Sequence, residues 1–249
     1  MTQPDLRSIS AVVFDIGGVF TVPHPDPMSD LLAAMGFEAD RSDHLRFERA
    51  HYHGVRAITE ALMADEYDDD TDYESSAATW TAYDIAYFAQ VGVPEHRLTE
   101  ASNARATQRG QGVKGIWRHP LSENIAASAR IAALLPVAVV SNNDGTAERQ
   151  LVDQGVGQVG EGPLTSLAAV VDSGAIGIAK PDPAIFAPVV EALGTDPGEI
   201  LYVGDTVHAD VRGATAAGLP VVQLDPYDLH DDHEHWRLPG LTDLAAILS

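Results

Sequence analysis

The sequence contains no cysteine, and only two of its 249 residues are lysine. The absence of cysteine excludes disulfide bonds, thiolate metal sites and thiol catalysis. No apolar stretch approaches the roughly 20 residues that a membrane-spanning helix needs. The amino-terminal segment also lacks the basic region and apolar run of a secretory signal peptide, so we expect a cytoplasmic protein with no membrane partner.

Positive charge is scarce altogether, because 37 acidic residues stand against 15 basic ones and the formal net charge is -22. Such a field repels nucleic acid and anionic membrane surfaces, so we expect no nucleic-acid partner. A site for an anionic substrate must therefore reverse the sign of the charge locally. Lys180, one of the two lysines, lies just before a predicted helix and is the candidate for that task.

Short apolar runs alternate with helical patterns over most of the chain, which favours a doubly wound α/β domain. Runs of this length fit strands that are buried on both faces of a parallel sheet. The predicted strands are 11–14, 136–140, 168–171, 200–203 and 220–224. The predicted helices are 123–135 with Ser122 as its N-cap, 146–154, 183–193, 207–217 and 241–248.

One region breaks this alternation. Between about residues 23 and 112 the pattern shows helical stretches and no convincing strand. We therefore predict a Rossmann-like parallel-sheet core of residues 1–22 and 113–249, with an all-helical domain of residues 23–112 inserted after the first strand. The helices expected there are 28–35, 43–52, 58–67, 75–91 and 95–109, and the acidic run 65–72 is expected to be a solvated loop.

Polar residues follow the predicted strands at the edge where open α/β sheets bind ligands. Asp15 ends the first strand and can attack an electrophilic centre, which gives an acyl-type intermediate that water hydrolyses. Asp205 and Asp210 place two carboxylates near another strand end, and hard oxygen ligands of that kind suit Mg²⁺. Each residue alone fits a structural role, such as a turn or a helix cap, so the prediction depends on all of them meeting in one place.

Ser141, at the end of another predicted strand, and Lys180 are the other two candidate site residues. Ser141 and the amides that follow it precede a predicted helix, and the amino terminus of a helix is a good place for phosphate oxygens. Lys180 supplies a point positive charge that can pair with Asp15 and with an incoming anion.

In four segments the chain resembles the haloacid dehalogenase-like hydrolase superfamily. The helical insert is similar to the cap of that family, in the position typical of its C1 subclass. The segments are 14–19 (FDIGGV), 140–143 (VSNN), 177–186 (GIAKPDPAIF) and 203–218 (VGDTVHADVRGATAAG).

This resemblance implies a role for each matching residue, with Mg²⁺ as the cofactor and a small phosphorylated metabolite as the substrate. The implied reaction is hydrolysis of a phosphate ester through an aspartyl phosphate. The implied roles are Asp15 as nucleophile, Lys180 as its stabilising cation, Ser141, Asn142 and Gly18 as contacts of the phosphate, and Asp15, the carbonyl of Gly17, Asp205 and Asp210 around the metal.

Gly17 is a departure from the family pattern, because phosphatases of this family usually carry there a second Asp that protonates the leaving alcohol. Loss of general acid help costs roughly two to four powers of ten in rate. Another residue can replace the acid. The candidates are His24, His51, Tyr52 and His53.

Gly17 is also compatible with two different chemistries. In one, the leaving group needs no proton, as with an acyl phosphate or a halide, although the dehalogenase branch of the family is metal-independent and lacks the paired carboxylates. In the other, the domain binds a phosphorylated ligand with little turnover.

A further segment, 225–236, is dense in Asp and His; its spacing fits no standard metal site and favours a solvated acidic loop.

Overall fold

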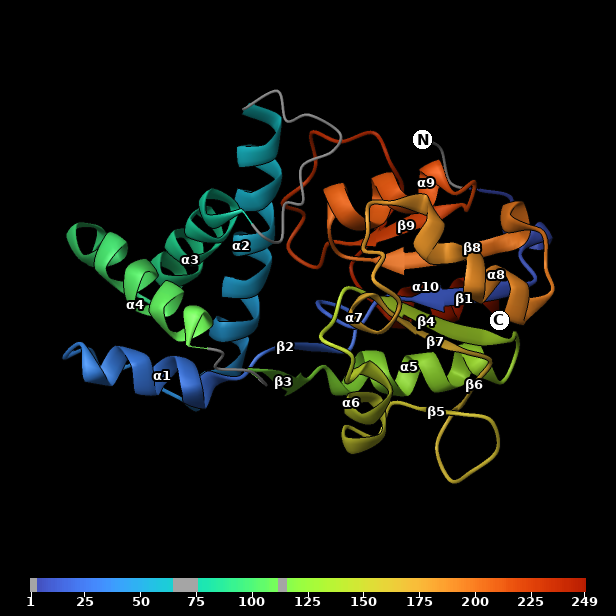
Figure 1. Ribbon diagram of the computed structural model, residues 1–249, viewed down its shortest axis with the longest axis horizontal. Coiled ribbons are helices and arrows are strands. Elements are labelled where there is room, and N and C mark those ends of the chain that lie inside the picture. Colours follow the sequence, from blue (N-terminus) through green and yellow to red (C-terminus); the bar gives the residue numbers. More distant parts are fainter. Residues whose placement is uncertain (1–3, 65–75, 112–115) are drawn as a thin grey trace. The chain divides into compact units, whose positions relative to one another are not determined.

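The computed structural model describes residues 4–64, 76–111 and 116–249. The chain forms two compact units, Met1–Thr21 with Pro120–Ser249, and Val22–His119 (Figure 1). The first is an α/β unit and the second is mainly helical, and each has its own core.

A parallel six-stranded sheet forms the centre of the α/β unit. Its strand order is β10-β9-β8-β1-β4-β7, so the first strand lies between β8 and β4. The central strands are fully buried, as expected for apolar runs covered on both faces. The strands are β1 Ala11–Phe14, β4 Val137–Ser141, β7 Val170–Asp172, β8 Ile200–Gly204, β9 Val221–Leu224 and β10 Arg237–Leu238.

Helices cover both faces of this sheet (Figure 1). One apolar core packs α5, α6 and α10 against it, and a second packs the segments from residues 183–193 and 207–217 against the other face. The helices are α5 Ser122–Ala132, α6 Ala147–Asp153, α7 Ser173–Ile176, η3 Pro183–Phe186, α8 Ala187–Leu193, η5 Val207–Arg212, α9 Gly213–Ala216 and α10 Leu241–Leu248. The short elements η1 Leu6–Ser8, η4 Pro197–Glu199, β5 Gln158–Val159 and β6 Ser166–Leu167 complete the unit.

The helical unit is built on the packing of α2 against α3 and of α3 against α4. Tyr87 and Phe88, on α3, are fully buried in its interior, and Phe47 on α2 is fully buried as well. Its elements are α1 Pro25–Ala34, α2 His44–Ala64, α3 Ala77–Gln90, η2 Glu95–Arg97 and α4 Leu98–Gly110, together with the paired strands β2 Thr21–Pro23 and β3 Trp117–Pro120.

The predicted fold class is confirmed, and all five predicted strands form near the expected positions. Several details were wrong. Ser122 is the first residue of α5, whereas Leu121 takes the cap position. The predicted helices 43–52 and 58–67 are one helix, α2, up to the last described residue of that stretch, because Gly54 between them packs closely on Tyr83 instead of ending the helix.

The strand pair β2 and β3 was not predicted. It contains Pro23, where the sequence showed no convincing strand, and it joins the two connections between the units. The division of the chain therefore falls at 119/120. The predicted boundary at 112/113 and the acidic run 65–72 lie outside the described residues.

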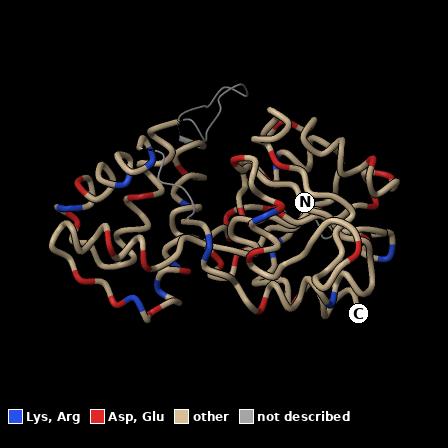
Figure 2. The backbone as a smooth tube through the Cα atoms, turned by 60° about the horizontal axis from the view of Figure 1, so that its bottom comes forward, with Lys and Arg blue, Asp and Glu red and all other residues tan. Residues whose placement is uncertain are grey.

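Asp and Glu residues are spread along the backbone of both units, with fewer Lys and Arg residues among them (Figure 2). In the part of the chain that the structure describes, no helix has the length and apolar character needed to cross a bilayer.

Candidate active site

The carboxyl ends of the three central strands bring the predicted residues together. The Asp15 N–H donates to the Val203 carbonyl of β8 over 2.9 Å, which fixes the end of β1 against β8. Ser141 is the last residue of β4, on the other side of β1, and is 3% exposed. Asp15, Ser141 and Asp205 therefore lie on one edge of the sheet, where ligands of open α/β sheets bind.

Lys180 reaches this edge from the segment that precedes η3. Its ammonium lies 2.9 Å from Asp15 Oδ1 and 2.6 Å from Asp210 Oδ1. The Lys180 side chain is 2% exposed and the Asp210 side chain is fully buried. A buried ion pair needs further hydrogen bonds to offset the loss of water, and those are present around both groups.

Asn142 fixes the backbone of Lys180. Its side-chain Oδ1 accepts from the Lys180 N–H over 2.7 Å, and its Nδ2 donates to the Lys180 carbonyl over 3.0 Å. The resemblance assigned Asn142 to the phosphate, yet both ends of its amide are engaged by Lys180. Its side-chain amide therefore holds the backbone of Lys180, which leaves the main chain of Asn142 as the predicted phosphate contact.

Asp210 lies in the short π-helix η5, and its carboxylate accepts hydrogen bonds from five donors. Oδ1 accepts from the Lys180 ammonium and from the Tyr202 hydroxyl. Oδ2 accepts from the N–H of Asp205 and from both the N–H and the hydroxyl of Thr206, the cap residue of η5. Wide turns of this kind occur frequently at functional sites, and here the turn directs the carboxylate back to the strand end.

Two glycines leave the space that these carboxylates occupy. Gly18 has φ +62°, and a Cβ built there would lie 2.0 Å from Asp205 Oδ2. A Cβ on Gly204 would lie 2.3 Å from Asp210 Cγ. Any side chain at either position would displace a carboxylate, which explains the glycines in the first and fourth motifs.

The pKa of Asp15 is raised to about 7, mainly because the carboxyl is buried, with Asp210 and Asp205 adding to the effect and Lys180 opposing it. Burial would lower the pKa of Lys180, but the carboxylates of Asp15 and Asp210 raise it above its usual value, so the lysine stays charged. When all three carboxyl groups are ionised, they and the one ammonium leave two negative charges in a buried site.

These charges fit a divalent cation. Asp15, Asp205 and Asp210 each offer a carboxylate oxygen, and the three oxygens lie within 4.8 Å of one another. Oxygen donors and a net negative charge are what Mg²⁺ requires. Because the oxygens of Asp210 already accept from protein donors, Asp15 and Asp205 have more capacity for a metal than Asp210 has.

The predicted phosphate site at the amino terminus of α6 is partly filled by the protein itself. Asp172 Oδ1 accepts from the N–H of Gly145, and its Oδ2 accepts from the N–H of Ala147, the first residue of α6. Asp172 also caps α7 through Gly174. Two amides at this helix end are therefore already bonded within the protein, and Ser141 remains the predicted phosphate contact on this strand.

The four candidates for a replacement acid lie in the helical unit. His24 Nδ1 accepts from the Asp26 N–H and so caps α1. His51 is 2% exposed and its Nδ1 lies 3.0 Å from the Tyr83 hydroxyl, while Tyr52 is buried beside it. His53 is half-buried, and burial together with Arg49 lowers its pKa.

The segment 225–236 is less solvated than predicted. Asp225 and His230 are buried, because the Asp225 carboxylate accepts from the N–H groups of Leu229 and His230 and closes the loop on itself. Gln223 ties this loop to the site by donating to the Asp205 carbonyl over 2.7 Å. Among the described residues, Asp15, Asp205 and Asp210 are the group placed to hold a metal, and the histidines of this segment form no such group.

Two functional candidates were missed in the sequence. Tyr202 lies in the apolar run of β8 and has the pattern of a core residue, although its hydroxyl contacts Lys180. Gln223 did leave a signal, since a fully buried glutamine inside the apolar run of β9 needs polar partners.

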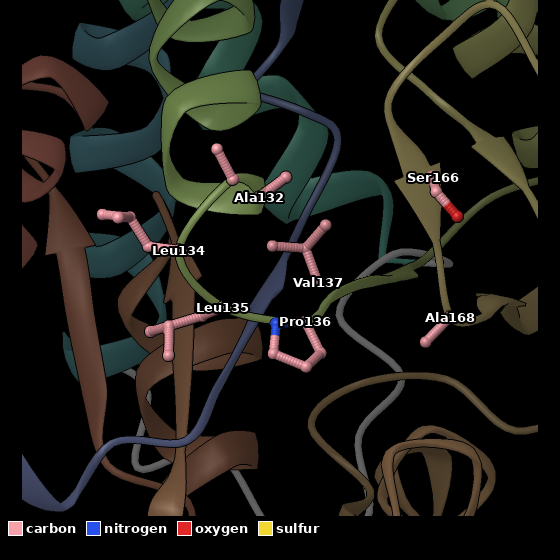
Figure 3. Close-up of a pocket in the computed structure, with 8 residues that line it drawn as sticks. Ala132, Leu134, Leu135, Pro136, Val137, Ser166 and Ala168 are labelled. Carbon is pink, nitrogen blue, oxygen red and sulfur yellow. The ribbon is translucent and has the colours of Figure 1, made fainter.

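A groove of about 420 Å³ lies elsewhere in the α/β unit (Figure 3). Its lining is mostly apolar and includes Leu134, Leu135 and Pro136, which precede β4, and Ala168. It lies at the amino end of β4, the end opposite to Ser141, so it is not part of the site described above.

Comparison with known proteins identifies one family and several relatives. The model of the haloacid dehalogenase-like hydrolase family matches residues 9–218. A phosphoserine phosphatase of Thermus thermophilus is 36% identical over 107 residues, which are 43% of this chain and 40% of that protein. A glyceraldehyde 3-phosphate phosphatase of Methanopyrus kandleri is 46% identical over 55 residues, which are 22% of this chain and 24% of that protein.

The match to these two relatives thus spans less than half of their length. Among solved structures, the magnesium-bound HAD-hydrolase YfnB of Bacillus subtilis is similar over 97% of this chain and 99% of that chain, with a TM-score of 0.56 and 14% identity. At that identity the likeness shows a shared fold.

Proposed function

Because the chain belongs to the haloacid dehalogenase-like hydrolase family, we propose that it is a Mg²⁺-dependent phosphatase of a small phosphorylated metabolite. The observation that carries the proposal is the buried Asp15–Lys180 ion pair next to two further carboxylates. The two relatives named as phosphatases support phosphoryl chemistry. Their substrates are not assigned to this chain, since the matched stretches are short.

In the proposed reaction, a carboxylate oxygen of Asp15 attacks the phosphorus of the substrate and the ester oxygen leaves. Water then attacks the aspartyl phosphate, which releases inorganic phosphate and restores the Asp15 carboxylate. Lys180 offsets the negative charge that the transferred group brings next to Asp15. The hydroxyl of Ser141 and the main chain at Asn142 and Gly18 contact the phosphate oxygens.

A Mg²⁺ ion held by Asp15, Asp205 and the Gly17 carbonyl, with Asp210 beside it, would supply the positive charge that a phosphate dianion needs in this acidic site. We propose that residues 22–119 act as a cap that excludes water and selects the substrate. The proposed source of the proton for the leaving oxygen is this unit, with the half-buried His24 and His53 as stronger candidates than the buried His51 and Tyr52.

The test is phosphate release from alkyl phosphates and from acyl phosphates, with Mg²⁺ and with EDTA. We expect release that requires Mg²⁺ and that disappears in Asp15→Asn. The matched control is Asp153→Asn, an exposed residue at the end of α6, which should keep wild-type rates. Halide release from haloacids that is indifferent to EDTA would instead indicate a dehalogenase.

The two groups of substrates also test the missing acid at Gly17. If a replacement acid exists, the rate of hydrolysis of alkyl phosphates should lie within about tenfold of the rate for acyl phosphates. Without such an acid, alkyl phosphates should be hydrolysed slower by roughly two to four powers of ten, which is the usual contribution of general acid catalysis. Thermal stabilisation by a phosphorylated ligand without any phosphate release would refute the proposed enzymatic activity and favour a binding domain.

A further inference from the structure

The hydroxyl of Tyr202 lies between the two charged groups that flank Asp15. It accepts from the Lys180 ammonium over 2.9 Å and donates toward Asp210 Oδ1 over 2.8 Å, with the Val140 carbonyl at 3.3 Å. Tyr202 is fully buried in β8, two residues before Gly204. A neutral hydroxyl is thus held among charged groups at the centre of the site.

The Lys180 ammonium has three oxygen neighbours, two of them hydrogen-bond acceptors and the third an ion-pair partner. They are Asp15 Oδ1, Asp210 Oδ1 and the Tyr202 hydroxyl. An ammonium is a compact charge on a flexible stem, so its direction is set by its partners. Two hydrogen-bond partners, Asp210 and Tyr202, hold it from the protein interior, at 2.9 Å from Asp15 Oδ1.

Tyr202 holds the Lys180 ammonium without adding a charge to the site. Its hydroxyl donates toward Asp210 while it accepts from Lys180, so it carries its proton. A carboxylate in its place would compete with Asp15 for the lysine, whereas the neutral hydroxyl accepts one hydrogen bond and donates another.

We infer that Tyr202 is a positioning residue, which holds the Lys180 ammonium against Asp15 in the reactive arrangement. The inference rests on the proposed function, because it concerns the lysine of the same site. Without the hydroxyl, the ammonium keeps Asp210 as its interior partner and moves toward that buried carboxylate and away from Asp15. Charge stabilisation at the transferred phosphate then falls.

Tyr202→Phe separates this role from packing. The ring contacts Phe186 edge-on, with centroids 5.0 Å apart, and phenylalanine keeps that contact. The matched control is Tyr87→Phe, which removes the hydroxyl of another fully buried tyrosine. That hydroxyl has no hydrogen-bond partner within the described residues and belongs to the helical unit.

We expect Tyr202→Phe to lower kcat for Mg²⁺-dependent phosphate release about 10- to 100-fold, the worth of a hydrogen bond to a charged group. KM should change less than about threefold, because the loss falls on the transition state. Tyr87→Phe should keep the wild-type kcat. Wild-type kcat in Tyr202→Phe, or a change confined to KM, would overturn the inference.

A second measurement reports the lysine directly. With two lysines in the chain, ¹⁵N-lysine labelling gives two ammonium signals, and Lys180→Arg identifies the buried one. We expect Tyr202→Phe to shift or broaden that signal through faster proton exchange, and Tyr87→Phe to leave it unchanged. An unaltered Lys180 signal in Tyr202→Phe also overturns the inference.

Failure of the proposed function is recognised separately. It shows as a wild-type protein that releases no phosphate with Mg²⁺, whereas failure of the Tyr202 inference shows as a variant that matches an active wild type.

Discussion

At the scale of single residues, the chemistry of the site depends on the proton that Asp15 carries when no cation is bound. The carboxyl shares one ammonium with Asp210, and its pKa is raised to about 7 by burial first and by the carboxylates of Asp210 and Asp205 second. A proton and a divalent cation are therefore alternative ways of neutralising the same group.

From this competition we predict that Mg²⁺ stabilises the protein more at pH about 8 than at pH about 5.5. Below about 7 the proton on Asp15 must leave before the ion binds, so the apparent affinity falls with falling pH. Thermal unfolding with and without Mg²⁺ measures the shift in Tm at each pH. Equal shifts at both values would contradict the prediction.

The stability of the metal-free protein should also depend on pH, because of the same raised pKa of Asp15. The folded-state pKa of Asp15 lies above its unfolded value of 3.8, so its contribution to stability is full below pH 3.8 and is lost as the pH rises through about 7. Asp15→Asn, which cannot ionise, should lack this loss. Burial would raise the pKa of Asp210, but Lys180 and the hydrogen bonds from Thr206 together lower it, so its contribution changes only below that window.

A second residue-scale prediction concerns Gly18. In Gly18→Ala the new methyl would lie 2.0 Å from Asp205 Oδ2, so the carboxylate must move and Mg²⁺ affinity should fall about tenfold or more. Gly36→Ala is the control: its φ of +82° imposes similar backbone strain, with nothing within 4 Å of the added atom. Titration of Mg²⁺ by calorimetry measures both. Similar affinities in the two variants would refute the steric interpretation.

Single residues also show how far the sequence predicts the site. Asp15, Lys180 and Asp205 were predicted to converge because each follows a strand or precedes a helix, and the parallel sheet brings them to one edge. The partners of Asn142 and Tyr202 were not predictable. Their side chains face residues distant in the chain, and those contacts depend on rotamers and register that no local pattern encodes.

At the scale of elements, Asp172 holds the loop between β4 and α6. Its carboxylate accepts from the N–H groups of Gly145, Ala147 and Gly174, so it caps two helices at once. We expect Asp172→Ala to lower the free energy of unfolding by about 2 to 3 kcal/mol, since three amides lose their charged acceptor, the buried Asp172 carboxylate. Urea unfolding measures the loss.

Asp182→Ala is the matched control, because Asp182 is exposed and caps η3 through a single bond to Ala184. Its loss should be about 1 kcal/mol or less. Equal losses in the two variants would show that burial and the number of bonds do not decide the strength of the cap.

Elements were predicted well where a pattern was long and local. The apolar runs of β1 and β8 are such cases, since both are buried along their whole length. Two elements depend on tertiary contacts instead. The strands β2 and β3 are short and pair across almost a hundred residues, and η5 is widened by the bonds between Thr206 and Asp210. Neither feature has a periodic signal.

At the scale of the whole molecule, the net charge of -22 opposes the entry of an anionic substrate. Lys180 offsets this field only in part, because its own charge is shared with Asp15 and Asp210. Salt screens such long-range repulsion over about 10 Å at 0.1 M, while the buried pairs inside the site are screened much less.

We therefore predict that kcat/KM for a phosphate dianion at saturating Mg²⁺ rises roughly two- to fivefold when KCl is raised from about 10 to about 200 mM. The rise should come from KM, because screening favours the encounter and leaves the buried charges around Asp15 as they are. A zwitterionic phosphate ester of similar size should gain less, which makes it the control. A fall of kcat/KM with salt would mean that positive potential dominates the approach to the site despite the acidic surface, and would contradict the prediction.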